Sequence, residues 1–418
     1  MSHYAVICPI EGMEQMAQLQ WISVLRRLGH QVEVYNLFSP RADPRIDLSG
    51  FVSKVVRNSP EIIFVEGAIG FSLPEFYLHP TIQQITVAAF WFDDPWRPVC
   101  YRKNQKGYLD ALRLPNVSHF VWDGYWRKWL FTNHQVRSFP IHLAADPDEF
   151  RPLPRSGEYP DHAVFIGTLV NLRHLEELKR KLPPVLRHIA SLLPSAMEGA
   201  PYGTNPYDIL DGLIKTLPAK MISACESLRE KEPDAVLNLH AFASKIGKNE
   251  VRKRILRETL KVAPLLIFCG NFERTHAGEK EIRAILNTDS NRLIVRDTGD
   301  INPSNLASLY AYGKIHLQAT DPQSVEGGIP FRVFQTTATR RPLLTDKKPE
   351  LAKCYSYGKE LLTFESDRDF ADTLQAAMAD PEKLDDVAQN SYRRFLRDHT
   401  WEKRFEYVVK TIKTAVAA

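Results

Sequence analysis

Two glycine-rich loops that commonly hold phosphate groups are missing from this sequence. After the first apolar segment, where a GxGxxG fingerprint would stand, the chain reads Pro9-Ile10-Glu11-Gly12, and no GxxxxGK[ST] occurs. The glycines of these motifs let the backbone approach a pyrophosphate closely. A nicotinamide-dependent enzyme and a P-loop nucleotidase are therefore disfavoured.

Cysteines and long apolar runs are also scarce. The five cysteines are far apart and none stands at CxxC spacing, so neither a zinc ribbon nor a disulfide framework is indicated. The longest apolar run, Ile85 to Phe92, is far shorter than the ~20 residues of a membrane span. The beginning, MSHYAVICPIEG, lacks the charged and apolar regions of a secretory signal. We therefore expect a soluble, cytoplasmic protein.

The charge balance is nearly even. Lys and Arg number 54 against 50 Asp and Glu, and a net charge of +4 over 418 residues does not favour a nucleic-acid partner. With 44% hydrophobic and 25% charged residues the composition is that of a globular protein, which excludes global disorder. At roughly 150 residues per domain, the length indicates two large domains or three small ones.

Short apolar segments alternate with amphipathic stretches in two series, which predicts two parallel sheets covered by helices. The strands predicted in the first series are Tyr4–Cys8, Val32–Tyr35, Ile62–Val65, Ile85–Phe92 and His119–Trp122. Those predicted in the second are Ala163–Ile166, Leu265–Phe268, Leu293–Val295, Ile315–Gln318, Leu343–Thr345 and Leu361–Phe364. Because such sheets bind ligands at the carboxyl ends of their strands, functional residues are expected in the turns that follow.

A stretch rich in proline and acidic residues separates the two series. It predicts an N-terminal domain at 1–145, a linker at 146–161, a second domain at 162–396 and a closing helix at 397–418. Residues 172–262 carry helical periodicity without a convincing strand, which predicts a long helical insert in the second domain.

Two segments of the second domain are typical of anion binding. Gly167 ends a predicted strand before a helix whose N-terminus could face an anion, with Arg173 six residues on; a tight turn followed by a surface arginine is an equal alternative. Gly327 and Gly328 open another helix, in which Arg332 adds a planar positive charge. Here the coincidence of glycines, helix start and arginine favours phosphate binding over an arginine paired with a neighbouring carboxylate.

The motifs from residue 85 onward resemble those of the glycosyl transferases group 1, and most closely the branch named after a spore-maturation protein (CgeB-like). GIPFRVFQ followed by PLLTD resembles the family pattern G-l-x-x-R-x-F-E with a later l-l-T-D. Further matches in the same order are FWFDDPW at 90–96, HLAADPDEFRP at 142–152, VFIGTL with Arg173, LYAYGKIHLQ at 309–318 and DHTWEKRFEYVV at 398–409. Their common order over residues 85–410 is the specific part of the resemblance.

The resemblance implies a GT-B fold, an α/β architecture of two Rossmann-like doubly wound domains facing a cleft, with the closing helix returning to the first domain. It implies a retaining glycosyltransferase whose second domain holds a nucleotide-diphosphate sugar and whose first domain holds a glycan, protein or small-molecule acceptor. Gly167 and Arg173 would lie at the diphosphate. Gly327, Gly328 and Arg332 would contact the phosphates or the transferred sugar. No permanently bound cofactor is expected.

The sequence departs from the family pattern at two positions. The carboxylate that binds the ribose falls on Gln335, which can hydrogen-bond hydroxyls but lacks the charge of a strong acceptor. A family glycine falls on Arg340. Glu326, just upstream, could take over part of the carboxylate's role. These departures leave open a non-catalytic GT-B-like binding or assembly protein. A nucleotide-sugar epimerase, which would share the donor site but need no acceptor, is a further alternative.

Carboxylates that follow strands are candidates for acceptor chemistry. Asp93 or Asp94 could orient or deprotonate an acceptor hydroxyl, and capping of the next helix is an equal alternative. Glu66 is a comparable but weaker candidate. Asp146 and Asp148 form a DxD sequence in the apparent linker, which predicts a solvated, helix-capping turn rather than a metal site. We therefore expect metal-independent binding.

The stretch WDGYWRKWLF at 122–131 interleaves aromatic side chains with Arg127 and Lys128. This pattern is typical of a helix that packs its aromatic residues inward and leaves its basic residues in solvent. Contact with a membrane surface is the less favoured alternative.

Overall fold

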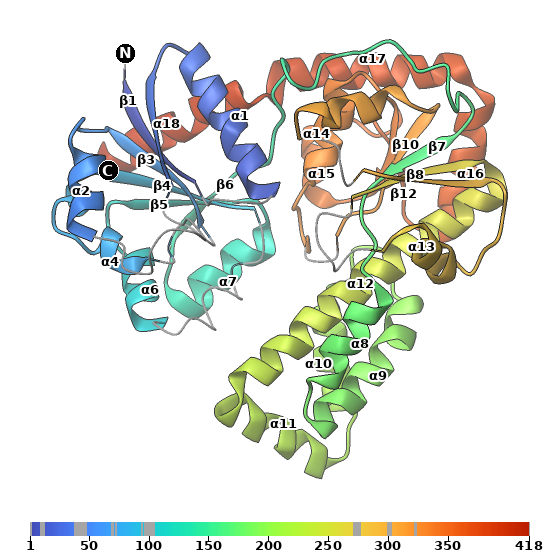
Figure 1. Cartoon of the computed structure of the whole chain (residues 1–418), viewed down its shortest axis with the longest axis horizontal. Coiled ribbons are helices and arrows are strands. Elements are labelled where there is room, and N and C mark those ends of the chain that lie inside the picture. Colours follow the sequence, from blue (N-terminus) through green and yellow to red (C-terminus); the bar gives the residue numbers. More distant parts are fainter. Residues whose placement is uncertain are drawn as a thin grey trace. The chain divides into compact units, whose positions relative to one another are not determined.

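The computed structural model describes residues 2–8, 13–36, 48–67, 71, 73–92, 95, 105–270, 277–298, 303–321 and 324–417. The chain divides into two compact units. Unit 1 comprises residues 1–146 and 398–418, and unit 2 comprises residues 147–397. Each unit contains a six-stranded parallel sheet with helices packed on it (Figure 1). The predicted α/β fold class is thereby confirmed.

Unit 1 has the strand order β2-β1-β3-β4-β5-β6. The strands are β1 His3–Cys8, β2 Gln31–Asn36, β3 Ile62–Glu66, β4 Thr86–Trp91, β5 Val117–Val121 and β6 Ser138–Pro140. The helices are α1 Met13–Arg27, α2 Leu48–Val56, α4 Pro74–Tyr77, η1 Ile82–Gln84, α6 Gln105–Leu112, α7 Gly124–His134 and α18 Trp401–Ala417. The five predicted strands are confirmed, and the short edge strand β6 was not predicted.

Aromatic side chains dominate the core of unit 1. Trp21 of α1 packs against Phe90 of β4 and against Trp401 of α18, with ring centroids 4.8 and 5.7 Å apart. The Trp401 indole donates to Gln20 Oε1 at 2.8 Å, so the polar end of this buried side chain is satisfied. The last helix thus belongs to the first sheet because it buries its aromatic side chains there.

Unit 2 has the strand order β12-β11-β10-β7-β8-β9. The strands are β7 Ala163–Ile166, β8 Leu265–Cys269, β9 Leu293–Asp297, β10 Ile315–Gln318, β11 Leu343–Asp346 and β12 Leu362–Phe364, as predicted to within two residues. The helices that accompany this sheet are α13 Glu279–Leu286, η2 Pro303–Ala311, α14 Phe331–Ala338, α15 Pro349–Cys354, α16 Asp367–Ala379 and α17 Pro381–Asp398. Its core is largely aliphatic.

A bundle of helices lies between β7 and β8. It consists of α8 Leu172–Arg180, α9 Pro184–Glu198, α10 Pro206–Lys215, α11 Ala219–Lys231 and the 30-residue α12 Pro233–Val262. The first half of α12 packs in the bundle's own core through Leu239 and Phe242, whereas Ile255 and Leu256 near its end pack in the core of the sheet. One helix therefore connects the bundle rigidly to the sheet (Figure 1).

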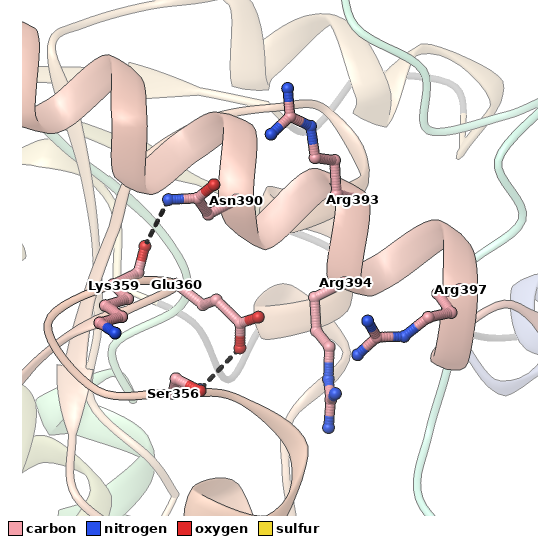
Figure 2. Close-up of a pocket in the computed structure, with 7 residues that line it drawn as sticks. All are labelled: Ser356, Lys359, Glu360, Asn390, Arg393, Arg394 and Arg397. Atoms are coloured by element: carbon pink, nitrogen blue, oxygen red, sulfur yellow. Dashed lines mark hydrogen bonds between the residues drawn. The ribbon is translucent and has the colours of Figure 1, made fainter.

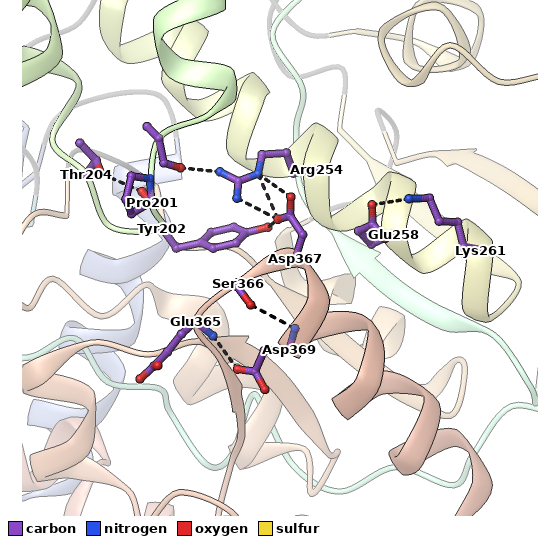
Figure 3. A network of polar contacts seen from close by, with 11 residues as sticks. Pro201, Tyr202, Thr204, Arg254, Glu258, Lys261, Glu365, Ser366, Asp367 and Asp369 are labelled. Atoms are coloured by element: carbon purple, nitrogen blue, oxygen red, sulfur yellow. Dashed lines mark hydrogen bonds and ion pairs between the residues drawn. The ribbon is translucent and has the colours of Figure 1, made fainter.

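A polar network fastens this bundle to the sheet (Figure 3). Arg254 of α12 contacts both carboxylate oxygens of Asp367, the first residue of α16, at 3.0 and 3.1 Å. The Tyr202 hydroxyl, from the loop between α9 and α10, donates to the same carboxylate at 2.6 Å, and the Arg254 guanidinium lies 4.3 Å from the Tyr202 ring centroid. Three segments distant in sequence thus share one carboxylate.

The segment that the sequence predicts as a linker is tied to unit 2. Arg341 donates to the carbonyl of Leu153 at 2.7 Å, and Arg155 pairs with Asp385 of α17 at 2.5 Å. Asp146, at the end of unit 1, is buried and bound by Arg27 at 2.7 and 3.0 Å. The prediction of a solvated turn is therefore wrong for Asp146, because the carboxylate is the partner of an arginine on α1.

A candidate anion-binding site in unit 2

Three cationic side chains lie close together at the carboxyl end of the unit 2 sheet. Lys248 and Arg252 are one turn apart on α12, and Arg332 lies in the first turn of α14. Arg252 donates to the carbonyl of Thr168, just beyond β7, and its pKa responds to the nearby charge of Arg332. We call Lys248, Arg252 and Arg332 the cation cluster.

The cation cluster lies where the strand order reverses. Successive strands run outward from β7 in one direction and from β10 in the other, so the loops after these two neighbours diverge and leave a crevice. Arg252 contacts the loop after β7, and Asp321, in the loop after β10, lies 3.4 Å from Lys248 and 4.0 Å from Arg252. Ligands of open α/β sheets bind at this kind of position.

Burial makes the positive charge of all three cations energetically costly. Burial is the main cause that lowers the pKa of Lys248 to about 8 and that of Arg252 to about 10, although Asp321 opposes both shifts. Burial also lowers the pKa of Arg332, and Tyr310 opposes that shift. Among the described residues, Arg252 Nε is buried without a hydrogen-bond partner. Because desolvated charge is costly unless it is paired, the cluster favours a multiply charged anion.

Tyr310 and Gln335 form the neutral side of the site. The Tyr310 hydroxyl donates to Gln335 Oε1 at 2.8 Å, one turn along α14 from Arg332. Burial raises the pKa of Tyr310 to about 12 while Arg332 opposes the shift, so the hydroxyl keeps its proton at neutral pH. Gln335 is 7% exposed. With Oε1 engaged by Tyr310, its Nε2 is the group with which Gln335 can donate to a ligand.

The loop after β7 is held from α12. Both side-chain amide atoms of Asn249 bond the backbone of Val170, at 2.8 Å to its nitrogen and 2.9 Å to its oxygen. A Cβ at Gly167 would lie 2.6 Å from the Phe165 ring, so no larger residue fits without displacing that ring. Arg173 begins α8 further along, with its side chain 85% exposed and paired with Glu177 at 3.2 Å. Gly167 therefore lies in the loop that Arg252 contacts, whereas the Arg173 side chain is exposed and pairs within its own helix.

The loop between β10 and α14 is held by side chains at and just after the end of β11. Buried Asp346 accepts from the backbone nitrogen and hydroxyl of Thr320, at 2.8 and 2.7 Å. Lys348 donates to the carbonyl of Ser324 at 2.8 Å, and the Ser324 hydroxyl bonds the carbonyl of Gly328. These bonds fix the start and the middle of the segment that leads to Arg332.

The remaining predicted residues of this loop are Glu326 and Gly327, directly before Gly328. A Cβ at Gly327 would collide with the side chain of Glu350, so only glycine fits there. Glu326 is partly exposed at the turn before α14. The structure thus gathers Glu326, Gly327 and Gly328 in one turn whose end is the start of α14.

The acceptor-side prediction falls mostly beyond what the structure describes. Asp93 and Asp94 lie outside the described residues. Glu66, the last residue of β3, is 7% exposed. His119 of β5 is buried and accepts from the Trp91 indole at 3.0 Å, while its Nε2 donates to the carbonyl of Leu112 at 2.8 Å. His119 is therefore a core residue.

Sequence reasoning missed four residues of this site: Lys248, Arg252, Tyr310 and Asp321. Lys248 and Arg252 stand in KIGKNEVRKRILRETLK, whose mixed charges at helical spacing are typical of a solvated face. A signal was present, because both share one face with the apolar residues Ile255 and Leu256. The local pattern does not show that α12 is long enough to bring this face to the loops beyond the end of the sheet.

Another basic depression lies on α17 (Figure 2) and has a structural explanation. It is lined by Ser356, Lys359, Glu360, Asn390, Arg393, Arg394 and Arg397. Arg394 donates to the carbonyls of Cys354 and Lys353 at 2.7 and 3.4 Å, which caps the end of α15. Glu360 accepts from the backbone nitrogen of Ser356 at 2.6 Å. The turn that precedes β12 lies at the amino end of the sheet, away from the cation cluster.

The described residues contain no group of three or more His, Cys, Asp or Glu side chains that could hold a metal ion. Across the part of the chain that is described, no helix is both long and apolar enough to cross a membrane.

In α7, Trp126 and Leu130 are buried whereas Lys128 and Phe131 are exposed, so the aromatic face packs inward only in part.

Comparison with known proteins gives one family match. Residues 252–410, a little over a third of the chain, match the family model described as glycosyl transferase-like. The match begins at Arg252 and includes Asp321 and Arg332, but it leaves out unit 1 up to β6 and most of the helical bundle. No curated protein matches the sequence.

Solved structures resemble the whole chain. A glycosyltransferase from Rickettsia africae is 10% identical, with a TM-score of 0.59 over 99% of this chain and 98% of that one. A sucrose-phosphate synthase from Thermosynechococcus elongatus is 13% identical, with a TM-score of 0.53 over 100% of both chains. Anabaena HepE in complex with UDP-glucose is 10% identical, with a TM-score of 0.52 over 99% of this chain and 100% of that one. The chain has the GT-B fold. At these identities the likeness concerns the fold alone.

Proposed function

We propose that this GT-B protein is a glycosyltransferase that moves a sugar from a nucleotide-diphosphate donor to a glycan, protein or small-molecule acceptor. The observation that carries the proposal is the cation cluster at the crevice of the unit 2 sheet: Lys248 and Arg252 pair with Asp321, and burial lowers the pKa of all three cations. The glycosyl transferase-like match of residues 252–410 supports the same reaction class. HepE, a protein of this fold, is known in complex with UDP-glucose.

The chemistry of glycosyl transfer explains why the cations would be needed. The bond between the sugar and the diphosphate breaks through an oxocarbenium-like transition state, and negative charge develops on the departing phosphate. Arg252 and Arg332 present planar donors that suit phosphate oxygens, and Lys248 adds a point charge. Two arginines and a lysine can therefore stabilise the leaving group without a metal ion. We propose metal-independent transfer with retention of configuration.

The nucleoside and sugar would lie beside these cations. We propose that Gln335 donates through Nε2 to a ribose hydroxyl and that the turn of Glu326, Gly327 and Gly328 faces the sugar. A diphosphate contact of Gly167 is supported by its place in the loop that Arg252 holds. A contact of Arg173 rests on the family resemblance, as does the orientation of an acceptor by Asp93 or Asp94.

The departure at Arg340 has a conformational explanation. Arg340 follows α14 with a φ of 55°, the left-handed region in which glycine is favoured. Its nitrogen bonds the carbonyl of Thr337 and the nitrogen of Arg341 bonds that of Thr336, the pattern of a Schellman turn. The exchange of the family glycine for arginine therefore strains a helix end and leaves the cation cluster untouched. It gives no support to a loss of activity.

A titration with UDP, GDP, ADP, TDP and CMP, in EDTA, tests the proposal by thermal unfolding. A ligand at about 100 times its dissociation constant stabilises the folded state by ~2.7 kcal/mol, which raises the unfolding temperature measurably. We expect one diphosphate to do so, and Arg332→Met to remove the effect while the protein stays folded. If none of these nucleotides shifts the wild-type transition, the donor site is refuted and a non-catalytic binding protein is favoured.

Product analysis then separates transfer from isomerisation. With the nucleotide identified, its sugar conjugates are incubated with the protein, with and without candidate acceptors. Slow release of free sugar or growth of an acceptor supports transfer. Conversion of one nucleotide sugar into another without any acceptor would instead show an epimerase.

A further inference from the structure

Asn249 stands between two members of the cation cluster in the sequence, and its side-chain amide is bonded to the loop after β7. It lies on α12 one residue after Lys248, and it is 4% exposed. Its side chain accepts from the backbone nitrogen of Val170 at 2.8 Å and donates to the backbone oxygen of the same residue at 2.9 Å. A primary amide carries a donor and an acceptor side by side, so it can accept from and donate to one residue's backbone at the same time.

The segment held by Asn249 is the loop that faces the crevice. Thr168 and Val170 are both bonded to α12, the first through Arg252 and the second through Asn249. The nitrogen of Gly167 bonds the carbonyl of Phe268, and the carbonyl of Leu169 accepts from the nitrogen of Ala277 at 2.8 Å. Four consecutive residues thus have a fixed position relative to the helix that carries Lys248 and Arg252.

This arrangement couples two parts of the site that the sequence keeps far apart. The loop follows β7, whereas Lys248 and Arg252 come about eighty residues later, as the 79-residue separation of Asn249 and Val170 shows. A ligand that contacts both parts binds tightly only if their separation is already correct, since ordering costs are then avoided. Two short bonds from a buried amide set that separation.

We propose that Asn249 is a positioning residue of the anion site, which holds the backbone of residues 168–170 at the correct distance from Lys248 and Arg252. The inference rests on the proposed function, because it assumes that a diphosphate bridges the loop and the cations. Asn249 acts through the loop and makes no contact with the ligand. Loss of its amide loosens the loop while the cations keep their charge.

The test compares Asn249→Asp and Asn249→Ala with wild type by calorimetric titration of inorganic pyrophosphate, well below the unfolding temperature. Aspartate keeps the acceptor for the Val170 nitrogen but places a carboxylate against the Val170 oxygen, and alanine removes both bonds. We expect the dissociation constant to rise about tenfold or more in both variants. Asn238→Asp, a half-buried asparagine on the same helix, is the matched control and is expected to bind like wild type.

A structural role alone would give a different result. Loss of two buried hydrogen bonds lowers the unfolding temperature in any case, so stability does not decide the matter, whereas the affinity of the folded protein does. Circular dichroism first establishes that each variant is folded. Hydrogen exchange is then expected to be faster at Val170 in Asn249→Ala, which removes the acceptor of that N–H, and unchanged along the first half of α12.

A double variant with Arg252→Met tests whether Asn249 and Arg252 act on the same loop. If they do, the loss of affinity in the double variant is smaller than the product of the single losses. Wild-type affinity in both Asn249 variants, with faster exchange at Val170, would overturn the positioning role and leave the proposed function intact. Failure of the wild-type protein to bind pyrophosphate or any nucleotide would instead refute the site itself, and the inference with it.

Discussion

The two sheets of this protein share a backbone plan but differ in the polar side chains that the structure describes as buried beside them. Each has six parallel strands, and the order reverses between β1 and β3 in unit 1 and between β10 and β7 in unit 2. In unit 1 the buried imidazole of His119 is neutral and satisfied by Trp91 and Leu112. In unit 2 the crevice gathers Lys248, Arg252 and Arg332, and the first two of these pair with Asp321.

The difference teaches that strand order fixes where a ligand can bind, whereas side chains decide which ligand it is. A neutral polar pair whose hydrogen bonds are all satisfied inside a core stabilises the fold and requires no ligand. Desolvated cations lower the stability of the free protein and are relieved by an anion. The buried polar groups of unit 1 are therefore expected to affect stability, and those of unit 2 to affect binding.

The largest expected effect is on binding and comes from Arg252. Arg252→Met should weaken the best-binding nucleoside diphosphate about 100-fold, because truncation of one partner in a buried charge contact costs several kcal/mol. Titration calorimetry gives the dissociation constant. The control is Arg173→Met, whose exposed pairing with Glu177 predicts a loss below about threefold. Equal losses of affinity in the two variants would indicate that Arg173 contacts the diphosphate as much as Arg252 does. The cation cluster would then have no special role in binding.

His119 should show the opposite behaviour. His119→Leu leaves the Trp91 indole and the Leu112 carbonyl unpaired and is expected to cost about 2 kcal/mol of unfolding free energy, with unchanged nucleotide affinity. Urea unfolding of wild type and variant measures the cost. If the variant is folded but no longer binds nucleotide, the distinction between stabilising groups in unit 1 and binding groups in unit 2 is wrong.

The same imidazole predicts how stability depends on pH. Burial lowers the pKa of His119 from 6.5 to about 4, so the unfolded state binds the proton more readily. Its contribution to stability is complete above about pH 6.5 and is lost as the pH falls toward about 4. Unfolding followed across this range should show a smaller pH slope in His119→Leu than in wild type. An identical slope would assign acid sensitivity to other groups.

Lys248 predicts a moderate pH effect on binding in unit 2. Its pKa of about 8 means that the side chain is mostly charged at neutral pH and loses its charge as the pH rises. Nucleoside diphosphate affinity should therefore fall about fivefold between about pH 7 and about pH 9, where the phosphate charge itself is nearly constant. Lys248→Met should bind more weakly at neutral pH and lose this dependence. A pH slope retained by the variant would place the titrating group elsewhere.

The smallest effect is expected at Arg340. Arg340→Gly relieves a left-handed arginine and should stabilise the protein by about 0.5 to 1 kcal/mol, with no change in nucleotide affinity. Thermal and urea unfolding measure the gain. A change in affinity would show that this exposed residue contributes to the site after all.

Much of the fold was accessible from the sequence because strands buried on both faces leave uninterrupted apolar runs. Eleven of the twelve strands were predicted, and several of them are such runs, as at Ile62–Val65 and Leu265–Phe268. The exception is β6 Ser138–Pro140, a three-residue edge strand whose serine and proline resemble a turn. The glycines at 167 and 327 were also identifiable, since each precedes a predicted helix. In the structure a Cβ at either position would clash with a neighbouring side chain.

The rest of the site could not be derived from local patterns. Asp146 stands in a hydrophilic segment, and only the folded chain shows that Arg27, 119 residues away in sequence, buries it. Lys248 and Arg252 look like ordinary charges of a solvated helix. Their burial depends on a 30-residue helix that reaches beyond the sheet to the loops after β7 and β10.

The sequence by itself determined two parallel α/β sheets, the long helical insert and the glycine-rich start of α14, because periodicity and local sterics act over a few residues. Only the tertiary structure decided which charges lose their water. That outcome depends on residues such as Thr168, Arg252 and Asp321, which no short motif connects. The desolvation that makes an arginine a ligand for phosphate is a property of the assembled crevice, and the order of the strands creates that crevice.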